Sequence, residues 1–249
     1  MQLLAGDSAL VTGAASGIGR GIARALAAEG VRLVLSHVSA EAGQALAKEL
    51  GAVFIEADLS QKSAARELFE QARTELQNIS IFVHSASPRR SETEHLTNVS
   101  EEQWDAMLTV GLRSGFILGQ AIGDHMKMSG IKGRMLYITS LHADTPRNLP
   151  HYSATKAGQT MLVKELAKAL GHAGIRVNAI APGAIPGGGF DASPQMKDMI
   201  ALGRTGTPED IANIAVALLC DRFSGYVTGT TVVVDGGLAL HNWIQPPVR

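Results

Sequence analysis

Residues 12–19 read Thr12-Gly13-Ala14-Ala15-Ser16-Gly17-Ile18-Gly19, between the apolar run 9–11 and a helical pattern that begins at Arg20. Three glycines at this spacing allow a strand to turn sharply into a helix and bring the backbone close to a bound diphosphate. The free N–H groups at the N-terminus of the helix then face the negative charge. Because a strand pattern precedes the glycines and a helical pattern follows them, the stretch predicts a nucleotide site rather than an ordinary turn.

The composition indicates one ordinary globular domain over residues 1–249. Of the 249 residues, 45% are hydrophobic and 18% are charged, and the formal net charge is −1. This is enough apolar material for a full core, and no run of Lys or Arg marks a nucleic-acid or anionic-membrane binder. We therefore expect a small-molecule partner, with no nucleic acid and no membrane.

The sequence shows no targeting segment at residues 1–7 and contains a single cysteine. Residues 1–7 lack a charged and apolar signal segment, and no run of about 18 consecutive apolar residues occurs, so a cytoplasmic location is expected. The single cysteine, Cys220, cannot form an intrachain disulfide. Its position in the apolar run 214–220 favours a buried core thiol over a nucleophile.

Short apolar runs alternate with longer helical patterns along the whole chain. Strands are expected at residues 8–12, 31–35, 52–55, 79–84, 135–139, 176–180 and 231–235, and helices at residues 17–29, 41–50, 62–76, 101–129, 152–170 and 208–220. Apolar strands joined by helices are typical of a parallel sheet that is covered on both faces. The pattern predicts a doubly wound, Rossmann-type α/β fold with a seven-stranded, mainly parallel sheet.

Two segments show no regular pattern, residues 87–99 and residues 184–194. Both follow the carboxyl ends of expected strands, where ligands bind in open α/β sheets. We interpret them as the walls and lid of a substrate pocket, with 184–194 as the substrate loop. Ordinary mobile surface loops are the alternative.

The candidate catalytic residues are Ser140, Tyr152 and Lys156. Tyr152 and Lys156 are four residues apart at the start of an expected helix, so their side chains project from one face. A nearby ammonium favours the phenolate and lowers the pKa of tyrosine from about 10, which allows it to act as an acid or a base. Ser140 ends the preceding strand, where its hydroxyl can hold a carbonyl or alcohol oxygen. The Tyr-x-x-x-Lys spacing by itself occurs by chance on many surface helices.

The turn Gly-x-x-x-Gly-x-Gly after Thr12, taken with Tyr152-x-x-x-Lys156, resembles the short-chain dehydrogenase/reductase family over nearly the whole chain. The Gly-Arg-apolar strand at residues 133–140 ends in a serine, as in the family. The resemblance implies that Tyr152 donates or accepts the proton, that Lys156 lowers its pKa and contacts the nicotinamide ribose, and that Ser140 orients the substrate oxygen. It also implies an NAD(P)-dependent oxidoreductase that moves a hydride between nicotinamide and a carbonyl or secondary alcohol, commonly as a homotetramer.

Further parts of the chain resemble the cofactor site of that family. Residues 58–59 resemble the adenine-contacting pair, residues 176–183 the stretch beside the nicotinamide, and Gly229 with residues 235–237 the closing strand. The cofactor-binding residues that the resemblance implies are Gly13, Ser16, Gly17, Ile18, Gly19, Ser36, His37, Asp58, Leu59, Ser85, Ala86, Tyr152, Lys156, Pro182, Gly183 and Ile185.

Three positions depart from the family pattern. Residues 84–87 read His-Ser-Ala-Ser in place of Asn-Asn-Ala-Gly, Gly111 replaces a helix asparagine, and Gly187 replaces a threonine. A non-catalytic dinucleotide-binding or regulatory relative therefore stays open as an alternative. Enoyl reduction also stays open, although enoyl-reducing relatives space the tyrosine and lysine further apart.

Gly111 is the departure that bears most on catalysis. In the family, the asparagine supports a distorted helix turn whose main-chain carbonyl holds a water on a proton path from the catalytic lysine. Glycine keeps that carbonyl and accommodates a distorted turn easily. We expect an irregular helix around Gly111, a water that bridges its carbonyl toward Lys156, and only a modest change in turnover for Gly111→Asn.

The end of the second expected strand bears on cofactor choice. His37 stands where NAD-selective relatives carry an acidic residue, so no carboxylate repels a phosphate. Ser36 can donate a hydrogen bond to a 2′-phosphate, and a protonated His37 adds positive charge. We therefore expect NADP to bind better than NAD. The preference is modest, because Ser16 occupies a position that is often basic in NADP-selective relatives.

The eight histidines show no His-Glu-x-x-His spacing and no partner set of cysteines, so no metal is expected. His142 and His151 lie near the candidate catalytic residues, and both substrate contact and a plain loop or helix-start position stay open for them. The tail 240–247 carries a tryptophan and two prolines. Packing on a neighbouring subunit and an ordered surface tail are equally open for this segment.

Overall fold

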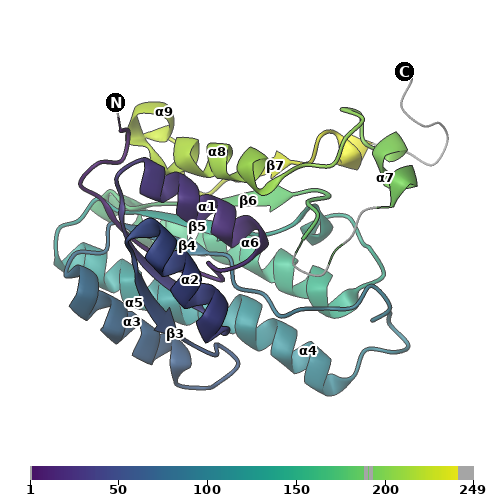
Figure 1. Cartoon of the computed structure of the whole chain (residues 1–249), viewed down its shortest axis with the longest axis horizontal. Helices are drawn as coiled ribbons and strands as arrows, with labels where there is room; N and C mark the ends of the chain where they lie inside the picture. Colours follow the sequence, from purple (N-terminus) through teal and green to yellow (C-terminus); the bar gives the residue numbers. More distant parts are fainter. Residues whose placement is uncertain (1, 188–189, 191–192, 241–249) are drawn as a thin grey trace.

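The computed structural model describes residues 2–187, 190 and 193–240, and Figure 1 shows their arrangement. Within these residues the strands are β1 (Ser8–Thr12), β2 (Arg32–His37), β3 (Val53–Glu56), β4 (Ile81–His84), β5 (Arg134–Ile138), β6 (Arg176–Pro182) and β7 (Thr231–Val234). They form one sheet in the order β3-β2-β1-β4-β5-β6-β7, and every neighbouring pair is parallel. The predicted doubly wound α/β fold with seven parallel strands is confirmed.

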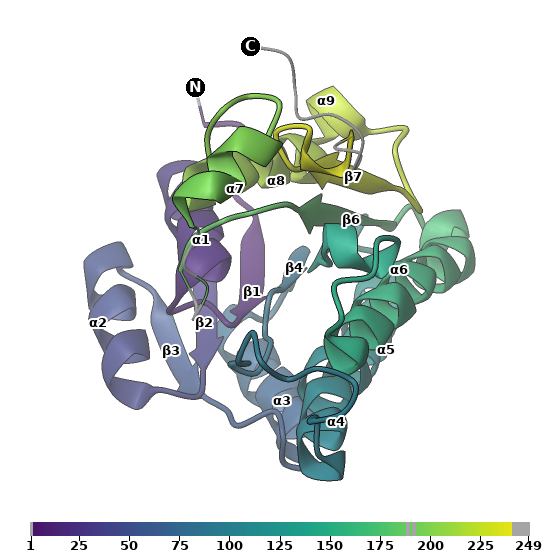
Figure 2. The ribbon, with the colours of Figure 1, turned by 90° about the vertical axis from the view of Figure 1, so that its right-hand side faces the viewer.

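Helices cover both faces of this sheet. They are α1 (Gly17–Ala28), α2 (Ala40–Leu50), α3 (Ala64–Leu76), α4 (Glu101–Met107), α5 (Ser114–Met128), α6 (Pro150–Leu170), α7 (Pro194–Met199), α8 (Pro208–Leu219) and α9 (Asp221–Ser224). Buried side chains form one core between the sheet and α1, α2 and α8, and a second core between the sheet and α3, α5 and α6. Figure 2 shows α1 and α8 on one side of the strands and α3 and α5 on the other. The apolar faces of the helices and the continuously apolar strands thus cover each other.

The helix predicted over residues 101–129 is not continuous. It begins as α4, passes into a π-helical segment, Leu108–Arg113, and continues as α5. A π-turn inserts an extra residue and breaks the regular hydrogen-bond ladder, which often happens at functional sites. The hydrophobic spacing of the sequence indicates a helix here, but it does not show where the helix is interrupted.

This same stretch is unusually apolar. By length and composition, Glu101–Met128 would suffice to cross a membrane, with a mean hydropathy of 1.2 over 18 residues. Half of those 18 residues are buried inside the protein, where α5 packs against α3 and the sheet. A helix that is covered by its own chain has the same composition, so packing accounts for its apolar character.

The chain changes direction at the centre of the sheet. β1 and β4 are neighbours, yet β1 is followed by β2 on one side and β4 by β5 on the other. Such a reversal leaves a crevice beyond the carboxyl ends of the two strands. The glycine-rich turn after β1 and residues 85–87 after β4 therefore lie side by side at this crevice.

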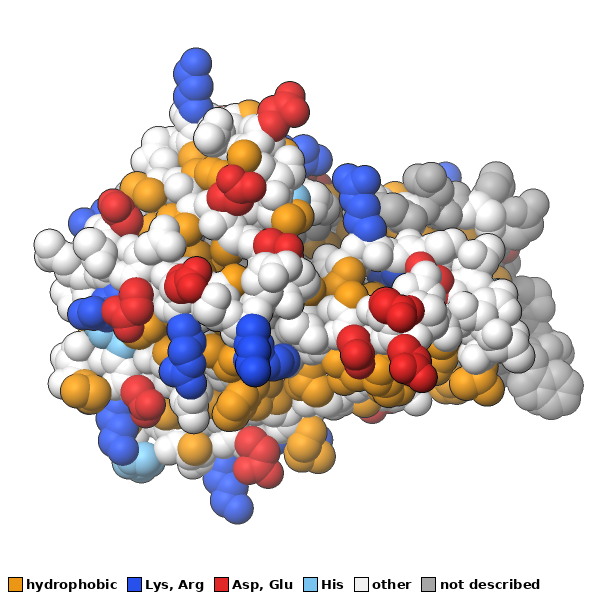
Figure 3. All heavy atoms as spheres, turned by 90° about the horizontal axis from the view of Figure 1, so that it is seen from below, with side chains coloured by type: hydrophobic (Ala, Val, Ile, Leu, Met, Phe, Trp, Pro, Cys, Tyr) orange, Lys and Arg blue, Asp and Glu red, His pale blue; other side chains and the backbone are white. Residues whose placement is uncertain are grey.

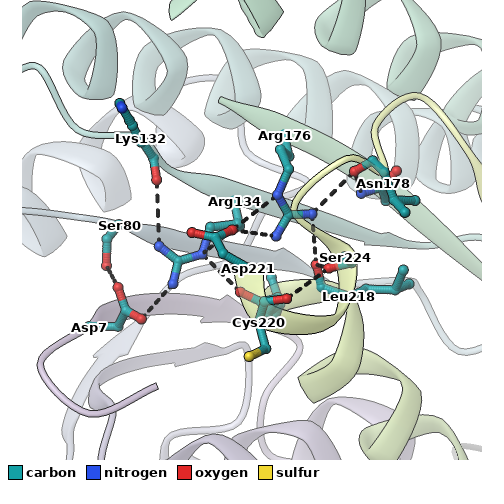
Figure 4. Close-up of polar contacts among 12 residues, drawn as sticks. Asp7, Ser80, Lys132, Arg134, Arg176, Asn178, Leu218, Cys220, Asp221 and Ser224 are labelled. Carbon is teal, nitrogen blue, oxygen red and sulfur yellow. Dashed lines mark hydrogen bonds and ion pairs between the residues drawn. The ribbon is translucent and has the colours of Figure 1, made fainter. Parts of the chain in front are cut away.

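A network of polar contacts lies at the opposite end of the strands, where the strands begin (Figure 4). Arg134 at the start of β5 donates to Asp7 at 2.6 Å and to the carbonyl of Leu219 at 2.9 Å. Arg176 at the start of β6 donates to the Asp221 carboxylate at 2.9 Å. These bonds tie the starts of β1, β5 and β6 to the corner between α8 and α9, at the end of the sheet away from the crevice.

Candidate active site

A cleft of about 770 Å³ opens at the carboxyl ends of the strands. Its walls are the turn after β1, the segment after β4, the end of β5, the first turns of α6 and the segment after β6. All the residues expected to be catalytic or to bind the cofactor line it, with the exception of Gly19. The fold thus brings together residues that are spread over more than 170 positions of the sequence.

Two glycines let the turn after β1 pack closely. Gly13 has a φ of +65°, and a Cβ at this position would lie 2.8 Å from the backbone of Ala86. A Cβ on Gly19 would lie 2.2 Å from the carbonyl oxygen of Gly13. Gly19 therefore lies beneath the turn and allows α1 to pack against it, while Gly13 lies in the wall of the cleft.

The N-terminus of α1 faces the same cleft. Its N-cap, Ser16, is extended and makes no side-chain capping hydrogen bond. Gly17 follows with a φ of +46°, and a Cβ there would have open space around it. An uncapped helix N-terminus beside an unobstructed backbone fits the diphosphate of a dinucleotide. The residues of this chain are therefore compatible with the cofactor that the sequence implies.

The side chain of Asp58, at the position that the resemblance assigns to adenine contact, lines the cleft and is held by hydrogen bonds. It accepts hydrogen bonds from the hydroxyl of Ser60 at 2.7 Å, from the backbone N–H of Ser60 at 3.0 Å and from Gln61 at 3.2 Å. These bonds hold the pKa of Asp58 below its ordinary value. The carboxylate is thus ionised and oriented before any ligand binds.

The surroundings of His37 disfavour its protonated form. Burial, followed by the charge of Arg89, lowers its pKa below the ordinary value. Its Nδ1 accepts from the backbone N–H of Ser39 at 2.9 Å, so Nε2 carries the proton and meets the hydroxyl of Ser16 at 3.5 Å. The lowered pKa disfavours the charge that a protonated His37 would add, and Arg89 supplies a positive charge beside this position.

Among the candidate catalytic groups, Lys156 has a pKa far below its ordinary value. Its buried ammonium donates to the carbonyl of Ile138 at 2.8 Å, at the end of β5. Burial, and then the charge of Arg90, lower its pKa to about 7. Its Nζ lies 5.6 Å from the centre of the Tyr152 ring. The spacing of four residues therefore places both groups in one wall of the cleft, as expected for neighbouring turns of a helix.

Ser140 also lines the cleft, where the chain leaves β5. Its Oγ accepts the backbone N–H of His142 at 3.2 Å, so the hydroxyl hydrogen remains available for another acceptor. The imidazole of His142 packs edge-on to the ring of Tyr152, with centroids 6.4 Å apart. His151 behaves differently, because it is fully buried and its Nε2 pairs with Glu94 at 2.8 Å.

The carbonyl of Gly111 lies in the π-helical segment, so the predicted irregular turn is confirmed. It accepts two side-chain hydrogen bonds, from Nε2 of His84 at 2.8 Å and from Nε2 of Gln159 at 3.0 Å. A carbonyl oxygen has two lone pairs, and these donors can engage both, while the bridging water toward Lys156 stays a prediction. Burial lowers the pKa of His84 to about 4, and its Nδ1 accepts from the hydroxyl of Thr12 at 3.0 Å.

Several residues of the cleft were not predicted individually. Arg90 lies over the ring of Tyr152, with its Cζ 3.9 Å from the centroid, and Arg147 lies 5.2 Å from the ring centre of Phe190. Segment 87–99 was expected to form a wall, but nothing in its composition distinguishes Arg90 from Arg89. Only the packing of this segment against α6 makes the difference visible.

Some expectations concern residues outside the described part of the chain. They include Gly188 and Gly189 of the expected substrate loop and residues 241–247 of the tail. Within residues 2–187, 190 and 193–240, no three His, Cys, Asp or Glu side chains gather as metal ligands would. Cys220 is buried, in agreement with a core thiol.

Comparison with known proteins extends these findings. A family model described as "Enoyl-(Acyl carrier protein) reductase" matches residues 13–239. The "(3R)-3-hydroxyacyl-CoA dehydrogenase" of Mus musculus is 36% identical, over 92% of this chain and 95% of that protein. Among solved structures, a short-chain dehydrogenase/reductase from Serratia marcescens has a TM-score of 0.87 and 29% identity, over 95% of this chain and 99% of that one. A blue fluorescent protein from a metagenomic library, solved with NADPH, has a TM-score of 0.86 and 30% identity, over 96% and 100%.

A doubly wound sheet with a dinucleotide cleft at its topological switch point, together with these matches, defines a nicotinamide-dependent oxidoreductase. The chain belongs to the short-chain dehydrogenase/reductase family. Within that family it is an NAD(P)-dependent dehydrogenase.

Proposed function

We propose that this dehydrogenase interconverts a carbonyl and a secondary alcohol on a small substrate, with Tyr152 as the general acid and base. The observation that carries the proposal is the convergence of Ser140, Tyr152 and Lys156 on one cleft beside an uncapped helix N-terminus. A bound nicotinamide supplies or accepts the hydride. In the direction of reduction, Tyr152 donates its proton to the carbonyl oxygen, and in the direction of oxidation it takes the proton from the alcohol.

The other two residues prepare this proton transfer. The free hydroxyl hydrogen of Ser140 points the substrate oxygen toward Tyr152. The backbone carbonyl of Ile138 holds Lys156 in place, and an ammonium has two further donors for a ribose or for the tyrosine oxygen. Because its pKa is about 7, Lys156 exchanges protons readily near neutral pH, which suits a group that resupplies the tyrosine.

The decisive test is Tyr152→Phe, which removes the hydroxyl and retains the ring against Arg90. For each carbonyl compound that the wild type reduces, turnover by the variant should be lower by at least ~100-fold, the lower range for loss of a positioned acid or base. The dissociation constant for NADPH, measured by fluorescence titration, should change little. Turnover close to that of the wild type would contradict the assignment of Tyr152.

Enoyl reduction is the second candidate, because the matching family model carries that description. Tyr152 and Lys156 are four positions apart, whereas the resemblance implies a wider spacing in enoyl-reducing relatives. The panel should therefore contain a 2-enoyl thioester beside the matching 3-oxo and 3-hydroxyacyl thioesters. The hydroxyacyl pair is included because the mouse relative is named for it.

We also propose that NADP(H) binds more tightly than NAD(H). Ser36 lines the cleft at the end of β2, no carboxylate stands at position 37, and Arg89 places a positive charge near His37. A 2′-phosphate gains from such a cation, whereas a carboxylate at this place favours the free ribose. Titration with both reduced cofactors should give a lower dissociation constant for NADPH, and His37→Asp should reverse the order. Tighter binding of NADH by the wild type would show that the proposal is wrong.

We propose further that the protein is a cytoplasmic homotetramer. Figure 3 views the molecule from the side of α3, α4 and α5, and hydrophobic side chains appear there among the charged ones. Trp104 on α4, Phe116 on α5 and Met161 on α6 are exposed large apolar residues, which suit a subunit interface. The single buried cysteine suits a reducing compartment.

A further inference from the structure

Arg90 is a largely buried guanidinium without a good acceptor in the described part of the chain. Its side chain is 17% exposed, and its Nε is buried and makes no hydrogen bond. The nearest carboxylate is that of Glu92, whose oxygen lies 3.8 Å from an Arg90 nitrogen, beyond hydrogen-bond distance. An arginine with five N–H donors therefore lies in the substrate end of the cleft with its hydrogen-bonding capacity largely unused.

Glu92 does not compensate for this, because it is engaged by a second arginine. Arg147 donates to the other oxygen of Glu92 at 2.5 Å. One carboxylate thus serves two guanidinium groups, and the three side chains carry a net charge of +1. Glu94, the next carboxylate along this segment, pairs with His151 instead. The surplus positive charge lies beside Tyr152, since Arg90 covers its ring at 3.9 Å.

The lining of the whole cleft also carries a surplus of positive charge. Among the described residues, this lining includes the cations Arg20, Arg89, Arg90, Arg147 and Lys156, but a single carboxylate, Asp58. The phosphates of a dinucleotide account for cations near α1 and β2. They do not account for Arg90 and Arg147, which lie by Tyr152 and Phe190.

We propose that the substrate of this enzyme carries a carboxylate close to its reacting carbon, and that Arg90 binds this carboxylate with Arg147 beside it. The inference rests on the proposed function, because it places the reacting oxygen between Tyr152 and Ser140. A guanidinium presents paired donors that match the two oxygens of a carboxylate, and an unpaired buried charge is costly until its partner arrives.

The position of Arg90 limits the length of the substrate. It stacks on the ring of the same tyrosine whose hydroxyl meets the reacting oxygen, so only a few bonds can separate the carboxylate from the reacting carbon. Short oxo acids and hydroxy acids meet this condition. The corresponding thioester presents a neutral group at that place, which allows the two classes to be separated by experiment.

The test compares three substrates that share one reacting ketone: acetoacetate, methyl acetoacetate and acetoacetyl-CoA. With the wild type, kcat/KM for acetoacetate should exceed that for the methyl ester by at least about 30-fold, the range of one charge-assisted pair. In Arg90→Met the ratio of acid to ester should fall by at least about 30-fold. Arg24→Met, which removes an exposed arginine on α1, should leave the ratio unchanged.

Two results would overturn the inference. The first is a wild type that prefers the ester or the thioester to the acid. The second is an Arg90→Met variant in which acid and ester lose activity equally, because Arg90 would then act through Tyr152 and not on the substrate. If Arg90→Met does not fold, Arg90→Lys, which keeps the charge without the paired donors, should lower the ratio in part, and an unchanged ratio overturns the inference.

A binding measurement separates this inference from the proposed function. Calorimetric titration of the protein loaded with NADP⁺, which cannot reduce a ketone, gives affinities without turnover. Tighter binding of acetoacetate than of its ester, lost in Arg90→Met, supports the carboxylate site even if no carbonyl is ever reduced. Equal binding of acid and ester overturns the site even if turnover is found.

Discussion

The backbone carbonyl of Gly111 links β4 to α6, the helix that carries the proposed catalytic residues. His84 from β4 and Gln159 from α6 both donate to it, so three elements meet at one oxygen. The same α6 carries Tyr152 and Lys156 one to two turns earlier. The π-helical segment is therefore a support for the helix that bears the proposed acid and base.

The absence of a side chain at Gly111 is a packing requirement. A Cβ there would lie 2.6 Å from Cγ2 of Thr155, closer than real Cβ contacts. We therefore expect Gly111→Asn to lower the free energy of unfolding by about 1–3 kcal/mol, the usual range for overpacking. The expectation of only a modest change in turnover for Gly111→Asn is a separate prediction, which rests on the backbone carbonyl that both residues share.

Urea denaturation of a double-mutant cycle measures this clash. Thr155→Ser removes Cγ2, so the Gly111→Asn/Thr155→Ser pair should recover much of the lost stability. Gly130→Asn is the matched control, since Gly130 ends α5 in a left-handed turn with open space around it. A Gly111→Asn variant as stable as Gly130→Asn would show that no clash exists.

Ser140, Tyr152 and Lys156 could be located from the sequence because their signal is local. Two of them lie on one helix at a fixed spacing, and the third ends an apolar strand. The arginine over the tyrosine ring and the glutamine on the glycine carbonyl could not be located in this way. Their partners lie 62 and 48 residues away, respectively, so only the packed structure identifies them.

At the scale of elements, the two ends of the parallel strands have different roles, one in ligand binding and one in stability. The carboxyl ends of the strands form the cleft, while hydrogen-bonded charged side chains tie together the starts of β1, β5 and β6 (Figure 4). Arg176 donates to Asp221 and to the carbonyls of Leu218 at 3.0 Å and Val227 at 3.2 Å. The network therefore fixes the chain where α8 returns to the sheet.

Arg176→Met should destabilise the protein without affecting the cleft. The substitution would remove one of the two donors to each of the carbonyls of Leu218 and Val227, which keep Ser224 and Asn178 respectively, and would break the ion pair with Asp221. We expect a loss of about 1–3 kcal/mol in the free energy of unfolding. Arg24→Met, which breaks an exposed pair with Glu49, should cost at most about 1 kcal/mol. Chemical denaturation measures both, and NADPH affinity should be unchanged in each. Equal effects of the two substitutions would refute a structural role for the network.

The sequence predicted where helices and strands occur better than how the helices are interrupted. Apolar runs of strand length separated by helical periods are sufficient to give the seven strands and their parallel order. The interruption at Leu108–Arg113 is expected from the family resemblance at Gly111, whereas the side-chain donors that it receives from β4 and α6 are contained in no local pattern. Short helices such as α7 and α9 carry too few residues for a periodic signal.

For the molecule as a whole, charge is distributed unevenly. The net charge is −1, yet five cationic side chains and one carboxylate line the cleft within the part of the chain that the structure describes. Such a cleft attracts anionic ligands by its field as well as by direct contacts. The same concentration of charge contributes to the low pKa of Lys156, since Arg90 adds to the effect of burial.

This low pKa makes stability depend on pH in a definable window. The folded protein holds the Lys156 proton with a pKa of about 7, against an ordinary value of 10.5 in the unfolded chain. Between these values the unfolded state binds the extra proton, so the free energy of unfolding rises with pH, by at most about 1.4 kcal/mol per unit. Below pH 7 both states are protonated and this contribution is constant. Chemical denaturation of the cofactor-free protein at pH 7, 8 and 9 should show the rise in the wild type relative to Lys156→Met, where all other titrating groups cancel. Parallel curves for the two proteins would mean that Lys156 keeps its charge in the folded state.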